Sequence, residues 1–147
     1  MTKDFLLAHW PGVREDLISV VDSFTDSDLG FIPFTGSWSA GRIMLHISNT
    51  ADHWLHNGVI GPKFDRSAEK RFETLAEIKS RLQDEHQRTI ALLKDFNVAN
   101  WEHPFRFPGG HDYTPDWVFW HVFEHEIHHR GELSLILGLL DRAGLDV

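Results

Sequence analysis

The most informative stretch of the sequence runs from Thr114 to Leu140 and reads TPDWVFWHVFEHEIHHRGELSLILGLL. Its first residues favour a helix start, because Thr114 is a good N-cap, Pro115 suits the first helical position, and an acid follows near the positive end of the helix dipole. Apolar residues then recur at helical spacing to the end of the stretch. The stretch therefore predicts one long helix that ends before Gly144.

Two segments in the first half of the chain have the same helical spacing of apolar residues. The first covers about residues 4–24 and contains Pro11, which predicts either a kink or the start of a separate helix, and we favour the kink. The second begins after Ser39, a good N-cap, and meets stop signals at Gly58 and at residues 61–62. Both segments predict helices that bury one face.

A third helical segment opens at Thr74, where the pattern Thr-Leu-Ala-Glu predicts a capping box with Glu77. Between this helix and the last one, residues 97–113 contain several Pro and Gly and predict a loop with a short extended piece at 101–107. No alternation of apolar residues is frequent enough to predict a sheet. The sequence thus predicts an all-α fold, an antiparallel four-helix bundle, as a single domain over residues 1–147.

Length and composition fit one globular domain and exclude several kinds of site. The 147 residues include 14 Lys and Arg against 22 Asp and Glu, a formal net charge of −8, which argues against nucleic acid as a partner. The chain has no Cys, which excludes a disulfide scaffold, a cysteine zinc ribbon, an iron–sulfur centre and a cysteine nucleophile. The longest late apolar stretch, Leu133 to Leu140, is too short to span a membrane, and no targeting signal is evident. We therefore expect a cytoplasmic protein with no membrane partner.

Histidine is the unusual residue, since the chain has 11 and two of them, His125 and His129, lie four apart in the predicted long helix. That spacing puts two imidazoles on one helix face, where both can reach one metal ion at ~2.0–2.1 Å. His121 lies a further turn back on this face, and His128 points about 100° away from it. A hydrogen-bonded or solvated pair is the alternative. Burying unpaired imidazoles costs free energy, so we favour metal ligation, because neighbouring apolar residues predict a heavily buried helix: Trp117, Trp120, Ile127 and Leu133.

A third ligand has to come from another segment, and His46 is the best candidate. It lies beside Ile43 and Ile47 on the predicted inward face of the second helix. A lone histidine on an apolar face is more often a hydrogen-bonded core residue, but facing helices of a bundle commonly build a metal site together. The residues thus predict a site that joins His46 to the pair on the long helix.

The same stretch contains a His-Glu-x-x-His motif, HEIHH from His125 to His129, which in zinc peptidases supplies two ligands and a general base. Glu126 is therefore a candidate catalytic residue. The extended form of the motif fails, because its glycine would fall at Glu132, and the chain lacks the strand signals of a peptidase cleft. A zinc peptidase is a remote alternative.

The sequence resembles the DinB/YfiT-like family of metal-dependent four-helix-bundle proteins. The firmest part is HEIHHRGEL at residues 125–133, which is similar to the family motif His-x-x-x-His-Arg-Gly-Gln with Glu132 in place of Gln. A second part is Trp-Ser at residues 38–39, followed by a helix that contains His46. The resemblance extends over most of the chain and implies that the ligand triad is the same three histidines.

The resemblance also implies a divalent ion, zinc or nickel, with open positions for water or a small-molecule substrate, in a cytoplasmic homodimer. Relatives include thiol-dependent transferases, an isomerase and hydrolases, so we expect either a thiol-dependent S-transferase or a hydrolase. Because the chain has no Cys, any thiol has to be an external low-molecular-weight cosubstrate. A non-catalytic metal-binding module of the stress response is the alternative.

Some neighbours of the triad are candidates for supporting roles. Glu124, Glu126 and Glu132 are close enough in sequence to orient a ligand imidazole or to move a proton, although each is more simply a charge on a helix face. The loop at residues 101–113, which includes His111, is a candidate mouth of the site because it directly precedes the long helix.

Overall fold

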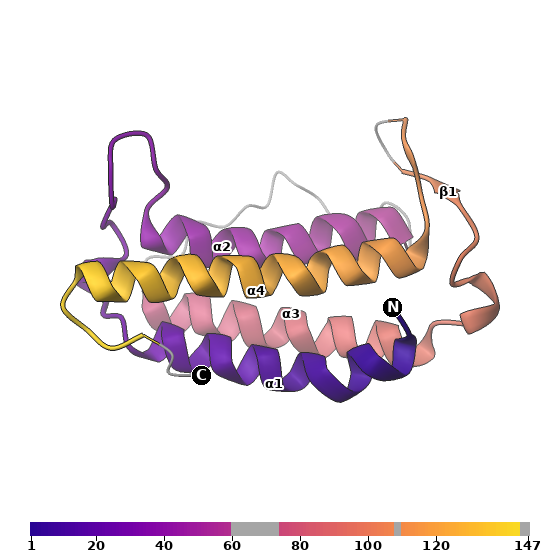
Figure 1. The fold of residues 1–147 in the computed structure, drawn as a ribbon, viewed down its shortest axis with the longest axis horizontal. Coiled ribbons are helices and arrows are strands. Elements are labelled where there is room, and N and C mark those ends of the chain that lie inside the picture. Colours follow the sequence, from indigo (N-terminus) through magenta and orange to yellow (C-terminus); the bar gives the residue numbers. More distant parts are fainter. Residues whose placement is uncertain (60–73, 108–109, 145–147) are drawn as a thin grey trace.

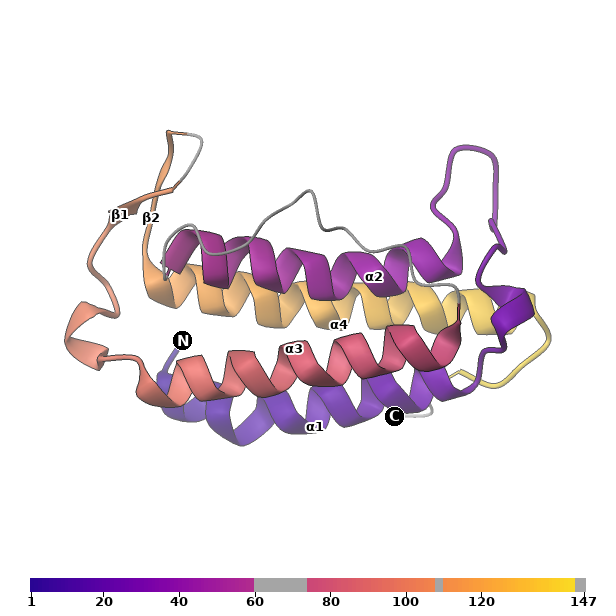
Figure 2. The ribbon, with the colours of Figure 1, turned by 180° about the vertical axis from the view of Figure 1, so that it is seen from behind.

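The structure is a computed structural model and describes residues 1–59, 74–107 and 110–144. Its four long helices are α1 (Lys3–Asp22), α2 (Ala40–Ala51), α3 (Leu75–Asp95) and α4 (Pro115–Leu139). They lie side by side as a four-helix bundle (Figures 1 and 2), which confirms the prediction of an all-α four-helix bundle. Among the described residues, none of the helices is long and apolar enough to cross a membrane.

Each helix of the bundle packs on two others: α1 on α3 and α4, and α2 on α3 and α4. α1 and α4 run in one direction, and α2 and α3 run in the opposite direction (Figure 1). The antiparallel neighbours are therefore α1 with α3 and α2 with α4, while the other two neighbouring pairs are parallel. This arrangement places α4, with its histidines, against α2, which carries His46.

The predicted helix starts are confirmed by their caps. The Ser39 hydroxyl accepts a hydrogen bond from the backbone amide three residues later. Thr74 and Glu77 form the capping box at the start of α3. Thr114 is the N-cap of α4 but makes no side-chain capping bond, so Pro115 at the first position is the stronger signal there.

The structure refines two predictions, one for the first helix and one for the connection before α4. α1 is one continuous helix with Pro11 inside it, so the alternative of two separate helices is wrong. Between α3 and α4, β1 (Phe105–Arg106) pairs in antiparallel register with β2 (Asp112–Tyr113). The extended piece expected at residues 101–107 is therefore confirmed only at its end.

α2 passes directly into a π-helix, η2 (Asp52–Val59), which the spacing of apolar residues does not predict. The last residue of η2, Val59, directly follows Gly58, one of the two predicted helix stops. The other predicted stop, at residues 61–62, lies outside the described residues. The fully buried Asp52 carboxylate anchors this turn, because it accepts hydrogen bonds from Arg81 and Arg88 of α3.

A charged layer separates two apolar clusters in the core. One cluster lies toward the C-terminal ends of α1 and α4 and the other toward their N-terminal ends. Between them, Arg14 of α1 donates hydrogen bonds to both Glu126 oxygens at 2.8 Å and to Glu85 of α3 at 2.9 Å. Arg14 is 4% exposed, and the two glutamates are 1% and 0% exposed. This layer therefore links α1, α3 and α4 through buried charges.

Asp28, in the short turn η1 (Asp26–Asp28), connects the segment after α1 to the segment after α4. Its carboxylate accepts hydrogen bonds from Arg142 and from both the amide and the hydroxyl of Thr25. The hydrogen bond from Arg142 is the main cause that lowers the pKa of Asp28 to about 2. The ionised carboxylate is thus the form that the fold stabilises.

Replacing Asp28 with asparagine is expected to lower the free energy of unfolding by about 1 kcal/mol at pH 7. The folded pKa lies below the unfolded value of ~3.9, so this stabilisation is present above about pH 4–5 and is lost as the pH falls toward 2. Urea unfolding of both proteins at pH 7, and at the lowest pH at which both still fold, measures the difference. A difference that does not shrink at the lower pH would contradict the assignment.

Candidate metal centre

Three histidines from two helices come together where α2 packs on α4. His46 lies on α2, and His125 and His129 lie one turn apart on α4. Nε2 of His125 is 3.1 Å from Nε2 of His46 and 3.1 Å from Nε2 of His129. One possible ligand atom from each of the three lies within 4.8 Å of the other two. The structure thus brings together the three histidines that the sequence singled out.

The position of each histidine follows from the helix that carries it. The four-residue spacing on α4 holds the rings of His125 and His129 with centroids 4.3 Å apart. The His46 ring packs edge-on against Trp38, with centroids 4.7 Å apart, and lies 3.4 Å from the Thr50 hydroxyl. Because Trp38 comes just before the N-cap of α2, the start of that helix helps to place His46.

The spacing of the nitrogens fits a single metal ion. Nitrogens that each lie ~2.0–2.1 Å from one ion are separated by roughly 2.9–3.4 Å when they subtend angles between ~90° and ~109°. The two separations at His125, both 3.1 Å, fall in this range. A set of imidazole donors suits zinc, nickel and related transition metals. Three protein ligands also leave further positions open, which is typical of catalytic rather than closed structural sites.

The surroundings of the centre keep His125 neutral. Burial, followed by the neighbouring imidazoles of His129 and His46, lowers the pKa of His125 to about 3. A neutral imidazole keeps the lone pair that metal binding requires. His129 is 8% exposed, whereas His46 and His125 are only partly buried, so the centre lies close to the surface of the bundle.

Glu126, the candidate catalytic residue, lies in the core between α4 and α1. Its Oε1 accepts a hydrogen bond from Arg14, and its Oε2 accepts one from Arg14 and one from the Trp10 indole at 2.9 Å. The structure therefore does not bring Glu126 to the three histidines, and both of its oxygens are engaged elsewhere. This geometry does not favour the role of general base that the zinc-peptidase motif suggested.

Two further histidines of α4 lie outside the cluster of three. His121 stacks on Trp117 with ring centroids 4.8 Å apart, and its Nδ1 is 3.4 Å from Glu124. His128 is exposed. Both lie near a candidate ligand, with ring centroids 6.0 Å apart for His121 and His125 and 4.9 Å apart for His128 and His129, but neither belongs to the cluster of three.

The expectation that α4 is heavily buried is wrong for three of the four residues on which it rested. Trp117, Trp120 and Ile127 are 37%, 38% and 37% exposed, and only Leu133 is fully buried. The reason is that α4 carries apolar residues on all sides, so apolar spacing alone does not identify its inner face.

Comparison with protein families assigns this chain to a known group. A family model described as the DinB superfamily matches residues 10–133. The chain belongs to the DinB superfamily. A search of curated proteins found no match to the sequence.

Solved structures of DinB-like proteins share the fold. A DinB-like protein from Bacillus cereus ATCC 10987 has a TM-score of 0.81 at 19% identity, over 97% of this chain and 95% of that chain. YfiT from Bacillus subtilis, described as "a probable metal-dependent hydrolase with an unusual four-helix bundle topology", has a TM-score of 0.67 at 22% identity, over 92% and 87% of the two chains. A mycothiol-dependent maleylpyruvate isomerase has a TM-score of 0.65 at 11% identity, over 88% of this chain and 60% of that chain. At these identities the likeness shows the fold alone.

In this DinB protein, aromatic side chains gather beside the histidine face of α4. Trp54 of η2 lies 5.1 Å from Tyr113, 5.4 Å from Trp117 and 5.1 Å from His121, measured between ring centroids. Tyr113 belongs to β2, so the hairpin before α4 packs beside the helix that carries the centre. The exposed His111 contacts Tyr113, but no contact between His111 and the three histidines is observed among the described residues.

Two functional contacts were not predicted from the sequence, those of Arg14 and Trp10 with Glu126. The available signal was the position of Arg14 within the apolar stripe of the first helix, between Trp10 and Leu17. A charged residue on such a stripe needs a buried partner, and that partner is more than 100 residues away in the sequence.

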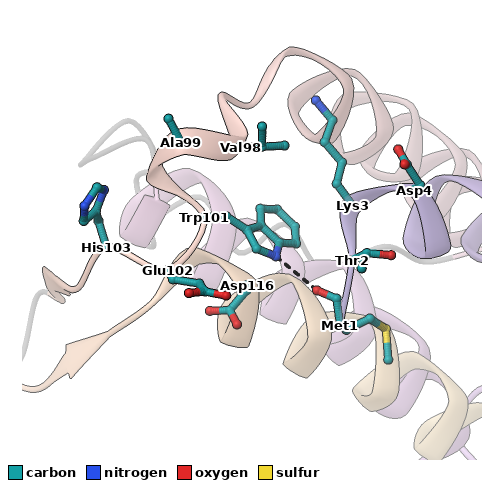
Figure 3. A pocket seen from close by; sticks show the side chains of 10 residues that line it. All are labelled: Met1, Thr2, Lys3, Asp4, Val98, Ala99, Trp101, Glu102, His103 and Asp116. Carbon is teal, nitrogen blue, oxygen red and sulfur yellow. Dashed lines mark hydrogen bonds between the residues drawn. The ribbon is translucent and has the colours of Figure 1, made fainter.

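The hollow drawn in Figure 3 is separate from the candidate metal centre of this DinB protein. It has a volume of about 670 Å³ and is lined by residues 1–4, 98–99, 101–103 and Asp116. Within it the Trp101 indole donates a hydrogen bond to the Met1 carbonyl at 3.0 Å. None of the three clustered histidines lines it, so the two sites are distinct.

Proposed function

We propose that this DinB-superfamily protein binds one divalent metal ion through His46, His125 and His129 and is an enzyme that acts on a small molecule at that ion. The observation that carries the proposal is the convergence of three Nε2 atoms, with separations of 3.1 Å at His125. Zinc and nickel are the ions we propose, because both bind readily to imidazole. The descriptions of two structural neighbours, one as a probable metal-dependent hydrolase and one as a thiol-dependent isomerase, support this function.

The chemistry proposed at this centre follows from the ligands. When bound, such an ion lowers the pKa of a coordinated water to about 7 or deprotonates a coordinated thiol. The three imidazoles would hold it through nitrogen lone pairs and, being uncharged ligands, would leave its positive charge intact. The chain has no cysteine to act as nucleophile, so the two reactions we propose are hydrolysis by water and transfer of an external low-molecular-weight thiol.

Protein purified without a histidine tag is expected to contain about one divalent ion per chain, which mass spectrometry of the metal content measures. Hydrolysis of 4-nitrophenyl acetate, and transfer of glutathione to 1-chloro-2,4-dinitrobenzene, are then assayed before and after treatment with a chelator. We expect turnover in at least one assay, lost on chelation and restored by zinc or nickel. A wild-type protein that takes up neither ion would refute the proposal. A bound ion with no turnover in either assay would favour the non-catalytic metal-binding module.

The proposal includes a cytoplasmic homodimer with no nucleic-acid partner. Apolar side chains are exposed along the outer side of α4, where a second copy could cover them: Trp117, Trp120, Ile127, Leu135 and Leu139. The net charge of −8 supports the absence of a nucleic-acid partner.

A further inference from the structure

Glu132 is in direct contact with one of the three clustered histidines. Its Oε2 lies 2.6 Å from Nδ1 of His129, and its Oε1 lies 3.3 Å from Nε2 of the exposed His128. The two contacts span three and four residues of α4, so helix geometry alone brings the groups together. The contact to His129 involves the nitrogen that faces away from the cluster, because Nε2 of the same ring faces His125 at 3.1 Å.

This contact determines where the proton of His129 resides. An ionised carboxylate only accepts hydrogen bonds, so a bond at 2.6 Å requires that Nδ1 of His129 carries the proton. A neutral imidazole has one such proton, and its Nε2 is then a bare lone pair directed toward His46 and His125. The ring is therefore held in the tautomer and the orientation that a metal ligand needs.

We infer that Glu132 is a positioning residue that fixes His129 as the Nδ1–H tautomer and thereby raises the affinity of the centre for a divalent ion. The inference rests on the proposed function. It adds to the three ligands a carboxylate that holds one of them, His129, in place without being a ligand itself. A carboxylate does this more strongly than an amide, because its negative charge also increases the basicity of the imidazole.

The same carboxylate could instead ligate an ion itself, because His128, His129 and Glu132 form a second group with closely spaced donor atoms. The distances favour the positioning role. Ligand atoms that share one ion at ~2.0–2.1 Å lie roughly 2.9–3.4 Å apart, whereas the 2.6 Å between Nδ1 of His129 and Oε2 of Glu132 is shorter than that range and lies next to the ~2.7–2.9 Å of charge-assisted N–H···O hydrogen bonds.

Glu124 provides a matched control on the same helix. Like Glu132, it has a side chain that is 43% exposed and faces a histidine at the i,i+3 position, but that histidine is His121, which is outside the cluster of three. The dissociation constant for zinc is measured by competition with a chromophoric chelator for the wild type and for E132A, E132Q, E124A and H128A. We expect E132A to weaken zinc binding by about 10- to 100-fold and E132Q by less, because the amide oxygen still accepts the hydrogen bond. E124A and H128A are expected to stay within about twofold of the wild type and to keep the same stoichiometry.

A second readout needs no metal and separates this inference from the proposed function. Nitrogen-15 correlation spectra of the metal-free protein at about pH 8 report the tautomer of each histidine. We expect His129 to be the Nδ1–H tautomer in the wild type and to lose this preference in E132A, even if the wild type were found to bind no ion. An Nε2–H tautomer in the wild type, or equal zinc affinities for E132A and E124A, would overturn the inference. A loss of affinity in H128A as large as that in E132A would also overturn the inference, because it would place the ion between His128, His129 and Glu132.

Discussion

Replacing His125 with alanine is expected to abolish stoichiometric binding of a divalent ion. Nε2 of His125 is the central atom of the cluster, 3.1 Å from Nε2 of His46 and 3.1 Å from Nε2 of His129. In H125A only the imidazoles of His46 and His129 remain, and the nitrogen that lies beside both of their Nε2 atoms is gone. We expect the affinity to fall by more than the ~10- to 100-fold typical of residues that only support a ligand. Metal content after gel filtration, and zinc competition with a chromophoric chelator, measure the loss.

His121→Ala is the control for this experiment. His121 lies one turn before His125 on the same helix and is also partly buried, but its ring stacks on Trp117. We expect the H121A protein to bind one ion with wild-type affinity. Circular dichroism of both metal-free variants should match the wild type, since each substitution places a good helix former within α4. Unchanged metal content in H125A would exclude the proposed ligand set, and equal losses in both variants would point to a general disturbance of α4.

The histidine triad could be predicted because helix geometry is local. Four residues on one helix are one turn, so His125 and His129 meet whatever surrounds them. Helix starts were predictable for the same reason, as the capping box of Thr74 and Glu77 shows. His46 required one further assumption, that the second helix faces the last one, and the contact between α2 and α4 supports it.

What the sequence could not show is which residues meet across the bundle. The His-Glu-x-x-His pattern suggested that Glu126 works beside the histidines, but one residue along a helix is a rotation of about 100°. That rotation turns Glu126 toward α1, where Arg14 and Trp10 bind its carboxylate. The partners are 112 and 116 residues away in the chain, so no local pattern predicts the pair. The two arginines that bind Asp52, at the start of the π-helix after α2, likewise come from α3, so no local pattern predicts that contact.

Replacing Arg14 with methionine is expected to lower the free energy of unfolding by about 3–5 kcal/mol, the cost of removing one partner from a buried ion pair. Arg14 donates hydrogen bonds to both oxygens of Glu126 and to Glu85, and each of these carboxylates is at most 1% exposed. Burial raises the pKa of Glu85, and the charge of Arg14 opposes that effect. Methionine fills similar space but leaves two carboxyl groups in the core without a cation. Urea unfolding, followed by circular dichroism at pH 7, measures the loss.

Arg130→Met is the matched control, because Arg130 also joins α4 to α1, through a hydrogen bond to Asp16 at 2.8 Å. That pair is more open, with side chains 17% and 45% exposed, so its loss is expected to cost no more than about 1 kcal/mol. A variant that combines R14M with E85Q and E126Q should recover part of the stability lost in R14M, since neutral amides are less costly to bury than unpaired carboxylates. If R14M destabilised the protein no more than R130M did, the charged layer would not hold the helices together as we argue. If the triple variant were less stable than R14M, the unpaired carboxylates would not be the cause of the loss.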